Sequence, residues 1–151
     1  MDEGQKEIQK QFREQQQKYT YYIIALCVAA IGFSIHETMG QPLRCSQIPL
    51  GISIFFWGLS VFCGLRFTAY GISTLYANNA YIDILNGKNK KYGTHPEKIT
   101  AASTGVSKAM ESNIEVGAKY AKWQNIGFYI GSVCFIIWHI VEMYTTAKNY
   151  K

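Results

Sequence analysis

Residues 45–65 read CSQIPLGISIFFWGLSVFCGL and contain no Asp, Glu, Lys or Arg. Two further stretches share this property, YTYYIIALCVAAIGFSIH at residues 19–36 and WQNIGFYIGSVCFIIWHIV at residues 123–141. The three uncharged windows are 21, 18 and 19 residues long. A helix needs roughly 20 mostly apolar residues to cross ~30 Å of hydrocarbon. Three such windows in 151 residues predict an all-α integral membrane protein with three long transmembrane helices.

Charged residues are concentrated outside these windows. The mean hydropathy of −0.05 would suit a soluble protein, but the average conceals the alternation of apolar and charged segments. Residues 1–18 and 70–122 hold eleven of the fifteen basic residues. The net charge of +5 is spread over the ends and loops, so it gives no reason to expect DNA as a partner.

The distribution of basic residues predicts an orientation in the membrane. Lys and Arg accumulate in the loops on the cytoplasmic side. Twelve of the fifteen lie in residues 1–18 or 66–122, and the other three are Arg44, Lys148 and Lys151. We therefore expect the N-terminus on the cytoplasmic or matrix side and the C-terminus on the outer side.

The charged segments are also predicted to be helical. Ile8, Phe12 and Tyr19 share one face of a helix that meets no breaker before the first window. Water-exposed extensions of 18 to 20 residues would each rise ~27–30 Å, so the three helices are predicted to continue into an inner-side helical bundle. The predicted order is an amphipathic helix 1–18, a first span 19–37, an outer loop 38–47, a second span 48–67, an inner hairpin 68–122 with a loop at 87–98, a third span 123–144 and an outer tail 145–151.

Small residues recur at intervals of four in all three spans. Such spacing lets helix backbones approach closely where lipid supplies no hydrophobic drive for association. The ridge residues are Ala25 and Ala29, then Ser60, Gly64 and Thr68, and finally Gly127 and Gly131. The ridges serve either packing within one copy of the chain or contact with a second copy, and the spacing alone does not decide between these roles.

Ionisable residues lie near the outer ends of the first and third spans. They are His36, Glu37, His139 and Glu142. With the predicted topology all four lie at a similar depth, and ionisable residues inside spans are often functional. A proton relay or a metal site is the sharper hypothesis, since His and Glu ligate Zn²⁺. The simpler interpretation is a set of interfacial side chains that reach the headgroups.

The predicted tip of the inner hairpin is strongly basic. The patch comprises Lys88, Lys90, Lys91, His95 and Lys98. At ~25 Å above the bilayer it would stand beyond a Debye length of ~8–10 Å, which argues against anionic lipid as its partner. The patch is either a solvated loop or a docking point for an acidic protein or an anionic ligand such as a nucleotide. The G-x-x-x-x-G-K-[ST] phosphate loop is missing from the sequence.

Catalytic motifs are missing too. The chain contains neither G-x-S-x-G nor H-E-x-x-H, so we expect neither an enzyme nor a cofactor. It has no C-x-x-C pair, and Cys45 is expected on the outer side. In an oxidising compartment this cysteine would be available for an intermolecular disulfide.

Two functional hypotheses follow from this pattern. The first is a non-enzymatic membrane protein that self-associates and forms or gates a pore in response to a cue on the inner side. The second is a structural accessory subunit of a larger membrane complex, which docks through the same ridges. A lower alternative assigns a metal or proton site to the outer ionisable residues.

Overall fold

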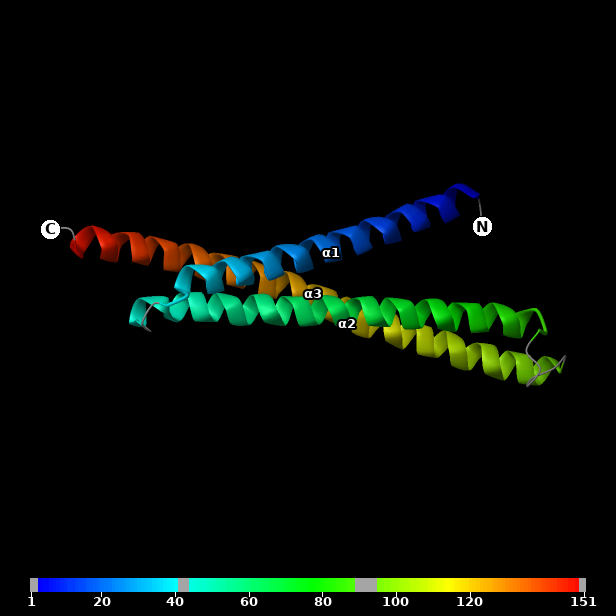
Figure 1. Ribbon diagram of the computed structural model, residues 1–151. Helices are drawn as coiled ribbons and strands as arrows, with labels where there is room; N and C mark the ends of the chain where they lie inside the picture. The colour runs from blue at the N-terminus through cyan, green and yellow to red at the C-terminus, as the bar shows by residue number, and fades with distance from the viewer. Residues whose placement is uncertain (1–2, 41–43, 89–94, 150–151) are drawn as a thin grey trace. The chain divides into compact units, whose positions relative to one another are not determined.

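The computed structural model describes residues 3–40, 44–88 and 95–149, and this part of the chain is almost entirely helical. Three α-helices follow one another, α1 (Glu3–Thr38), α2 (Ile48–Leu85) and α3 (Pro96–Asn149) (Figure 1). A short 3-10 helix, η1 (Cys45–Gln47), precedes α2. Each α-helix is long and apolar enough to span a membrane. The predicted helices are therefore confirmed, and each runs without interruption from an apolar window into charged sequence.

Helix α2 ends at a glycine cap, Gly87. Gly87 has φ of 65°, a left-handed conformation that costs glycine nothing sterically. The N–H of Lys88 donates to the carbonyl of Asp83 at 3.0 Å, and the N–H of Gly87 donates to that of Ile84 at 3.1 Å. This Schellman pattern pairs the last carbonyls of the helix.

The predicted loop 87–98 is too long. Helix α3 begins at Pro96, and the carbonyl of His95 accepts the first helical hydrogen bond from the N–H of Ile99 at 3.0 Å. The predicted loop included Pro96. In the first helical position, however, a proline costs no hydrogen bond, because the N–H that it lacks would have no partner within the helix. Glu97 in the first turn adds a favourable charge at the positive end of the helix dipole.

The predicted tail 145–151 is corrected as well, because α3 continues to Asn149. The hydroxyl of Thr145 donates to the carbonyl of Val141 at 2.8 Å, a bond to the preceding turn that is compatible with helix. The third apolar window is thus the middle of a 54-residue helix and not its end.

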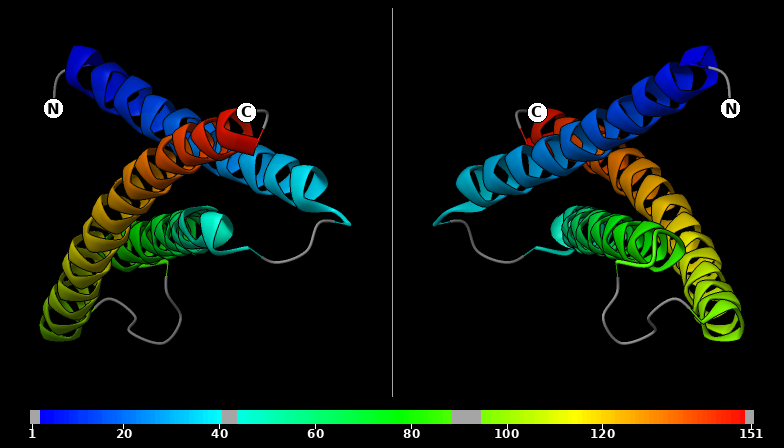
Figure 2. Two further views of the ribbon diagram at one scale, coloured as in Figure 1. Left: turned by 90° about the vertical axis from the view of Figure 1, so that its left-hand side faces the viewer. Right: turned by 90° about the vertical axis from the view of Figure 1, so that its right-hand side faces the viewer.

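The chain divides into two compact units. The first comprises Met1–Gly64 and Ala121–Lys151, so it contains α1, the beginning of α2 and the end of α3. Its core is formed by Ile23, Cys27 and Trp57. In Figure 2 the second half of α1 crosses the end of α3 at an angle, and the Phe33 and Phe135 rings meet there edge to face with centroids 6.5 Å apart.

The second unit, Leu65–Tyr120, is a helical hairpin made from the end of α2 and the beginning of α3. The Tyr70 and Tyr120 rings stack with centroids 5.7 Å apart and an interplanar angle of 19°. The side-chain amide of Asn113 donates to the Ser73 hydroxyl at 3.1 Å. These contacts join the two helices of the hairpin.

The described side chains at the charged beginning of α1 form no packed face. All its described side chains between residues 4 and 18 are exposed, and Ile8 and Phe12 are 67% and 63% exposed. The apolar stripe predicted from their spacing is therefore present but uncovered. Its packing into an inner-side bundle stays a prediction.

Candidate functional site

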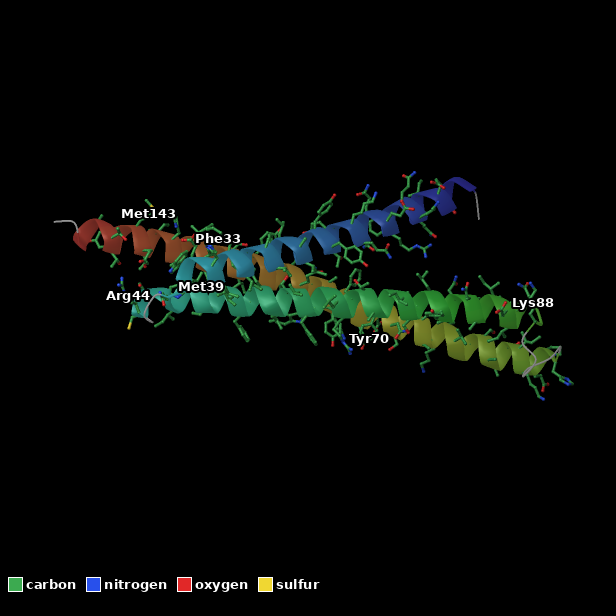
Figure 3. All side chains as sticks on the ribbon, in the orientation of Figure 1. Phe33, Met39, Arg44, Tyr70, Lys88 and Met143 are labelled. Carbon is green, nitrogen blue, oxygen red and sulfur yellow. The ribbon has the colours of Figure 1, made fainter. Side chains whose placement is uncertain are left out.

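Every Ser, Thr, Asn and Gln side chain in the three uncharged windows is buried or half-buried. The buried ones are Thr20, Ser34, Ser53, Ser60 and Gln124. The structure describes every residue of these windows, and none of their exposed positions carries Ser, Thr, Asn or Gln. Outward-facing side chains include Phe33, which Figure 3 labels on α1. The exposed surfaces of these windows are therefore largely apolar.

One buried cluster links all three helices, and we call Thr20, Ser60 and Gln124 the Gln124 cluster. The side-chain amide of Gln124, which is 2% exposed, donates to the carbonyl of Thr20 at 3.3 Å. The Ser60 hydroxyl donates to the backbone carbonyl of Gln124 at 2.8 Å. Nearby, the Tyr19 hydroxyl donates to Asn125 Oδ1 at 3.0 Å. These bonds fix the register of α1, α2 and α3.

Neither Thr20 nor Gln124 was predicted as a functional residue from the sequence. The available signal was the polarity of Gln124 inside an uncharged window, because an amide at such a position usually bonds across helices. The partner could not have been named, since it is a backbone carbonyl that every residue possesses.

Two of the predicted small-residue ridges meet each other within one copy of the chain. A Cβ added at Gly127 would lie 2.9 Å from the Phe56 carbonyl oxygen and 3.3 Å from Ser60. At Gly131 a Cβ would lie 2.6 Å from the Trp57 ring. At Gly64 it would lie 2.6 Å from Gln124 Nε2. Close approach of α2 and α3 thus depends on glycine at Gly127 and Gly131, where the new Cβ would also meet backbone atoms.

The remaining ridge residues lie elsewhere. Ala25 and Ala29 are exposed on α1, so the first ridge faces away from the core formed by Ile23 and Cys27. Thr68 belongs to the hairpin unit and is half-buried. The three ridges therefore do not form one common packing surface.

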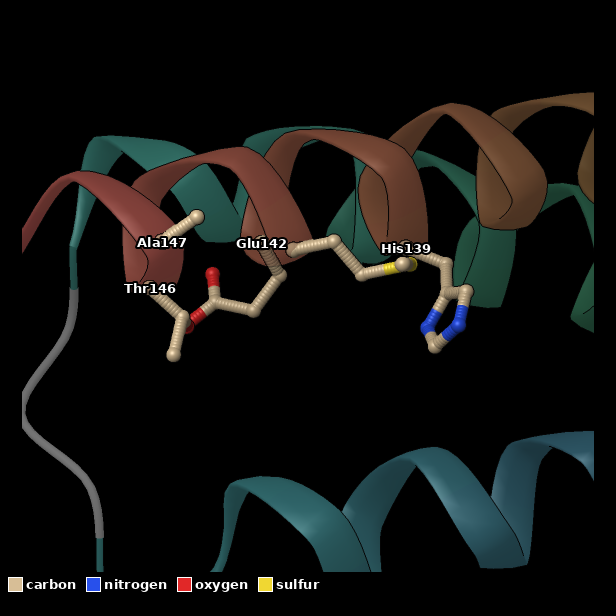
Figure 4. Close-up of a pocket in the computed structure, with 5 residues that line it drawn as sticks. His139, Glu142, Thr146 and Ala147 are labelled. Carbon is tan, nitrogen blue, oxygen red and sulfur yellow. The ribbon is translucent and has the colours of Figure 1, made fainter. Parts of the chain in front are cut away.

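The outer ionisable residues are divided between two places. On α1, His36 Nδ1 lies 3.9 Å from Glu37 Oε1, and the two side chains are 82% and 48% exposed. On α3, His139 and Glu142 line an open hollow of ≈ 380 Å³ (Figure 4). Its other lining residues, Met143, Thr146 and Ala147, also come from α3.

The hollow does not unite the predicted cluster, because its lining includes neither His36 nor Glu37. Glu142 Oε2 is buried and has no hydrogen-bond partner among the described residues. The described part of the chain contains no group of three or more His, Cys, Asp or Glu that could hold a metal ion. His139 and Glu142 are thus a pair on one helix face, as their spacing predicts.

The basic tip of the hairpin is described in part. Lys88, His95 and Lys98 are exposed, and Figure 3 labels Lys88 just beyond the end of α2. Lys90 and Lys91 lie outside the described residues. The described side chains are open to solvent, which both interpretations of the patch require.

Comparison of the chain with protein-family models, with curated proteins and with solved structures finds no match. The buried polar groups, the apolar exposed faces and the continuous helices are therefore the features that bear on function.

Proposed function

We propose that this chain is an integral membrane protein of three spans that docks onto other membrane helices as a structural, non-enzymatic subunit. The observation that carries the proposal is the segregation of polar groups in the three windows. The buried side chains of Ser34, Ser53, Ser60 and Gln124 donate to backbone carbonyls of the same chain. The exposed positions lack Ser, Thr, Asn and Gln. A surface of this kind suits lipid and apolar helix faces. On the inner side, exposed Lys88, His95 and Lys98 would receive an acidic protein or anionic ligand.

A pore formed between several copies is the second proposal. It is supported by the exposed Ala25 and Ala29 ridge, which would allow close approach of a second copy. The three continuous helices could transmit a tilt from a cue on the inner side. An apolar lining would gate such a pore by dewetting, because the exposed window positions offer water few polar partners.

The mass of the detergent-solubilised protein separates these proposals. As a subunit, the purified chain should be a monomer in mild detergent, measured by light scattering with correction for bound detergent. Liposomes containing it should be no leakier to a small dye than empty liposomes.

The opposite result is equally specific. A single defined oligomer of several copies that releases the dye would overturn the subunit proposal in favour of the pore. Replacing Ala29 by Leu should then dissociate the oligomer. The same substitution at Ala30, which is half-buried beside the core, tests whether the effect is confined to the exposed ridge.

The proposed orientation predicts which face of a sealed membrane exposes Cys45. This cysteine is exposed, whereas Cys27 and Cys63 are buried. A membrane-impermeant maleimide added to the outer side should label the protein, and Cys45→Ser should remove most of the label. In the Cys45→Ser background, Lys88→Cys should react only after the membrane is permeabilised. Labelling of Lys88→Cys from the outer side of sealed membranes would contradict the orientation.

A further inference from the structure

Arg66 has an unusual setting in the hairpin unit. It is the first charged residue after the uncharged window 45–65, and its side chain is exposed. Its guanidinium carbon lies 5.5 Å from the centroid of the Tyr70 ring and 5.8 Å from that of Tyr120. Both distances fall within the ~6 Å over which a ring face attracts a cation.

The two rings are brought together by the packing of the hairpin. Tyr70 follows Arg66 by one helical turn on α2, which places both on the same face. Tyr120 comes from α3, where buried Gly117 lies against Tyr70 and Phe67. A Cβ at Gly117 would sit 3.6 Å from Tyr70 Cβ. One turn further along, the Tyr120 ring stacks on the Tyr70 ring.

The guanidinium is held by aromatic rings and not by a carboxylate. Among the described residues, Arg66 forms no ion pair within 4.0 Å. Contact with two rings limits its rotamers, so less entropy is lost when it binds a ligand. The five N–H donors of a guanidinium match the oxygens of phosphate in a bidentate geometry. A positioned arginine without an acidic partner is suited to bind an anion.

We propose that Arg66, held by Tyr70 and Tyr120, binds the phosphate of an anionic phospholipid in the inner leaflet. This inference rests on the proposed membrane insertion, which places the residue after the second window at headgroup depth. Tyrosine rings favour the same depth. The exposed side chain of Lys119, next to Tyr120 in sequence, adds a second positive charge on the hairpin. The site would fix the depth of α2 in the bilayer.

Native mass spectrometry of the full chain tests the site by counting retained lipids. Detergent micelles are supplied with phosphatidylglycerol or, separately, with phosphatidylcholine. We expect the wild-type chain to retain phosphatidylglycerol preferentially. Arg66→Ala should lower its apparent affinity about tenfold, the loss expected when a charge-assisted hydrogen bond is removed. Arg66→Lys keeps the charge but loses the planar fork, and it should lose most of the preference too.

The matched control is Arg13→Ala, which removes the same charge from an exposed position of α1. It should retain phosphatidylglycerol as the wild type does. Equal retention by Arg66→Ala and Arg13→Ala would overturn the site, and full retention by Arg66→Lys would overturn the bidentate geometry. Displacement of the lipid by millimolar inorganic phosphate would identify a free-anion site and overturn the lipid assignment.

Alkaline carbonate extraction of the same membranes distinguishes this site from the proposed function. If wild type and Arg66→Ala both resist extraction while lipid retention is independent of Arg66, only the lipid site fails. If carbonate releases the wild-type chain from the membrane, the proposed three-span protein fails as well.

Discussion

Replacing Gly127 by alanine is expected to force α2 and α3 apart and to lower the free energy of unfolding by about 1–3 kcal/mol, as overpacking does in protein cores. The new Cβ would lie 2.9 Å from the Phe56 carbonyl oxygen and 3.3 Å from the Ser60 nitrogen. Both are backbone atoms, so rotation of a side chain does not relieve the clash. The movement would also strain the bond from the Ser60 hydroxyl to the Gln124 carbonyl.

Gly58→Ala is the matched control for this prediction. Gly58 lies in the same apolar window as Phe56 and Ser60, and a Cβ there would meet nothing within 4 Å. Alanine should therefore be neutral or stabilise α2 by up to about 1 kcal/mol, the difference in helix propensity. Unfolding in mixed micelles of mild detergent and dodecyl sulfate, followed by circular dichroism, measures the stability of Gly127→Ala and Gly58→Ala. Equal midpoints for the two variants would show that α2 and α3 do not meet at Gly127.

Trp57→Ala is the second variant with a large expected effect. Trp57 is 3% exposed and belongs to the core with Ile23 and Cys27. Its ring lies 5.4 Å from the Phe135 ring, centroid to centroid, and packs against Gly131. Removing a buried tryptophan leaves a cavity that its neighbours fill only in part, and such changes cost about 3–5 kcal/mol. We expect the variant to be unfolded or to unfold far below the wild-type midpoint.

Trp123 provides the comparison for this variant because it is the same residue type at a surface position. It begins the third window and is 56% exposed, so Trp123→Ala should leave the unfolding midpoint nearly unchanged. The same unfolding titration, followed by circular dichroism, measures the midpoints of Trp57→Ala and Trp123→Ala. A larger loss for Trp123→Ala than for Trp57→Ala would mean that the core formed by Ile23, Cys27 and Trp57 is assigned wrongly.

The three helices could be predicted from the sequence because length and apolar content are local properties. The C-terminal cap of α2 was predictable for the same reason, since Gly87 needs only its own backbone and that of the preceding turn. The start of α3 was predicted incorrectly because proline both breaks helices and begins them. Only the surrounding geometry, here the His95 carbonyl and the Ile99 N–H, distinguishes these roles.

The small-residue ridges show where sequence reasoning ends. Spacing identifies residues on one helix face, but it does not say which neighbour that face meets. Gly127 and Gly131 pack against α2, whereas Ala25 and Ala29 are exposed, although both pairs have the same spacing. The difference depends on the rotation of each helix, which long-range contacts such as that of Gln124 with Thr20 determine.

The Gln124 cluster has a consequence for the order in which the chain can fold during synthesis. Its bond to Thr20 spans 104 residues, and the bond from Tyr19 to Asn125 spans 106. Both join α1 to α3, which is synthesised only after α2. Contacts between distant segments form late because a long loop must close first. Helix α1 therefore lacks these partners until translation has passed Asn125.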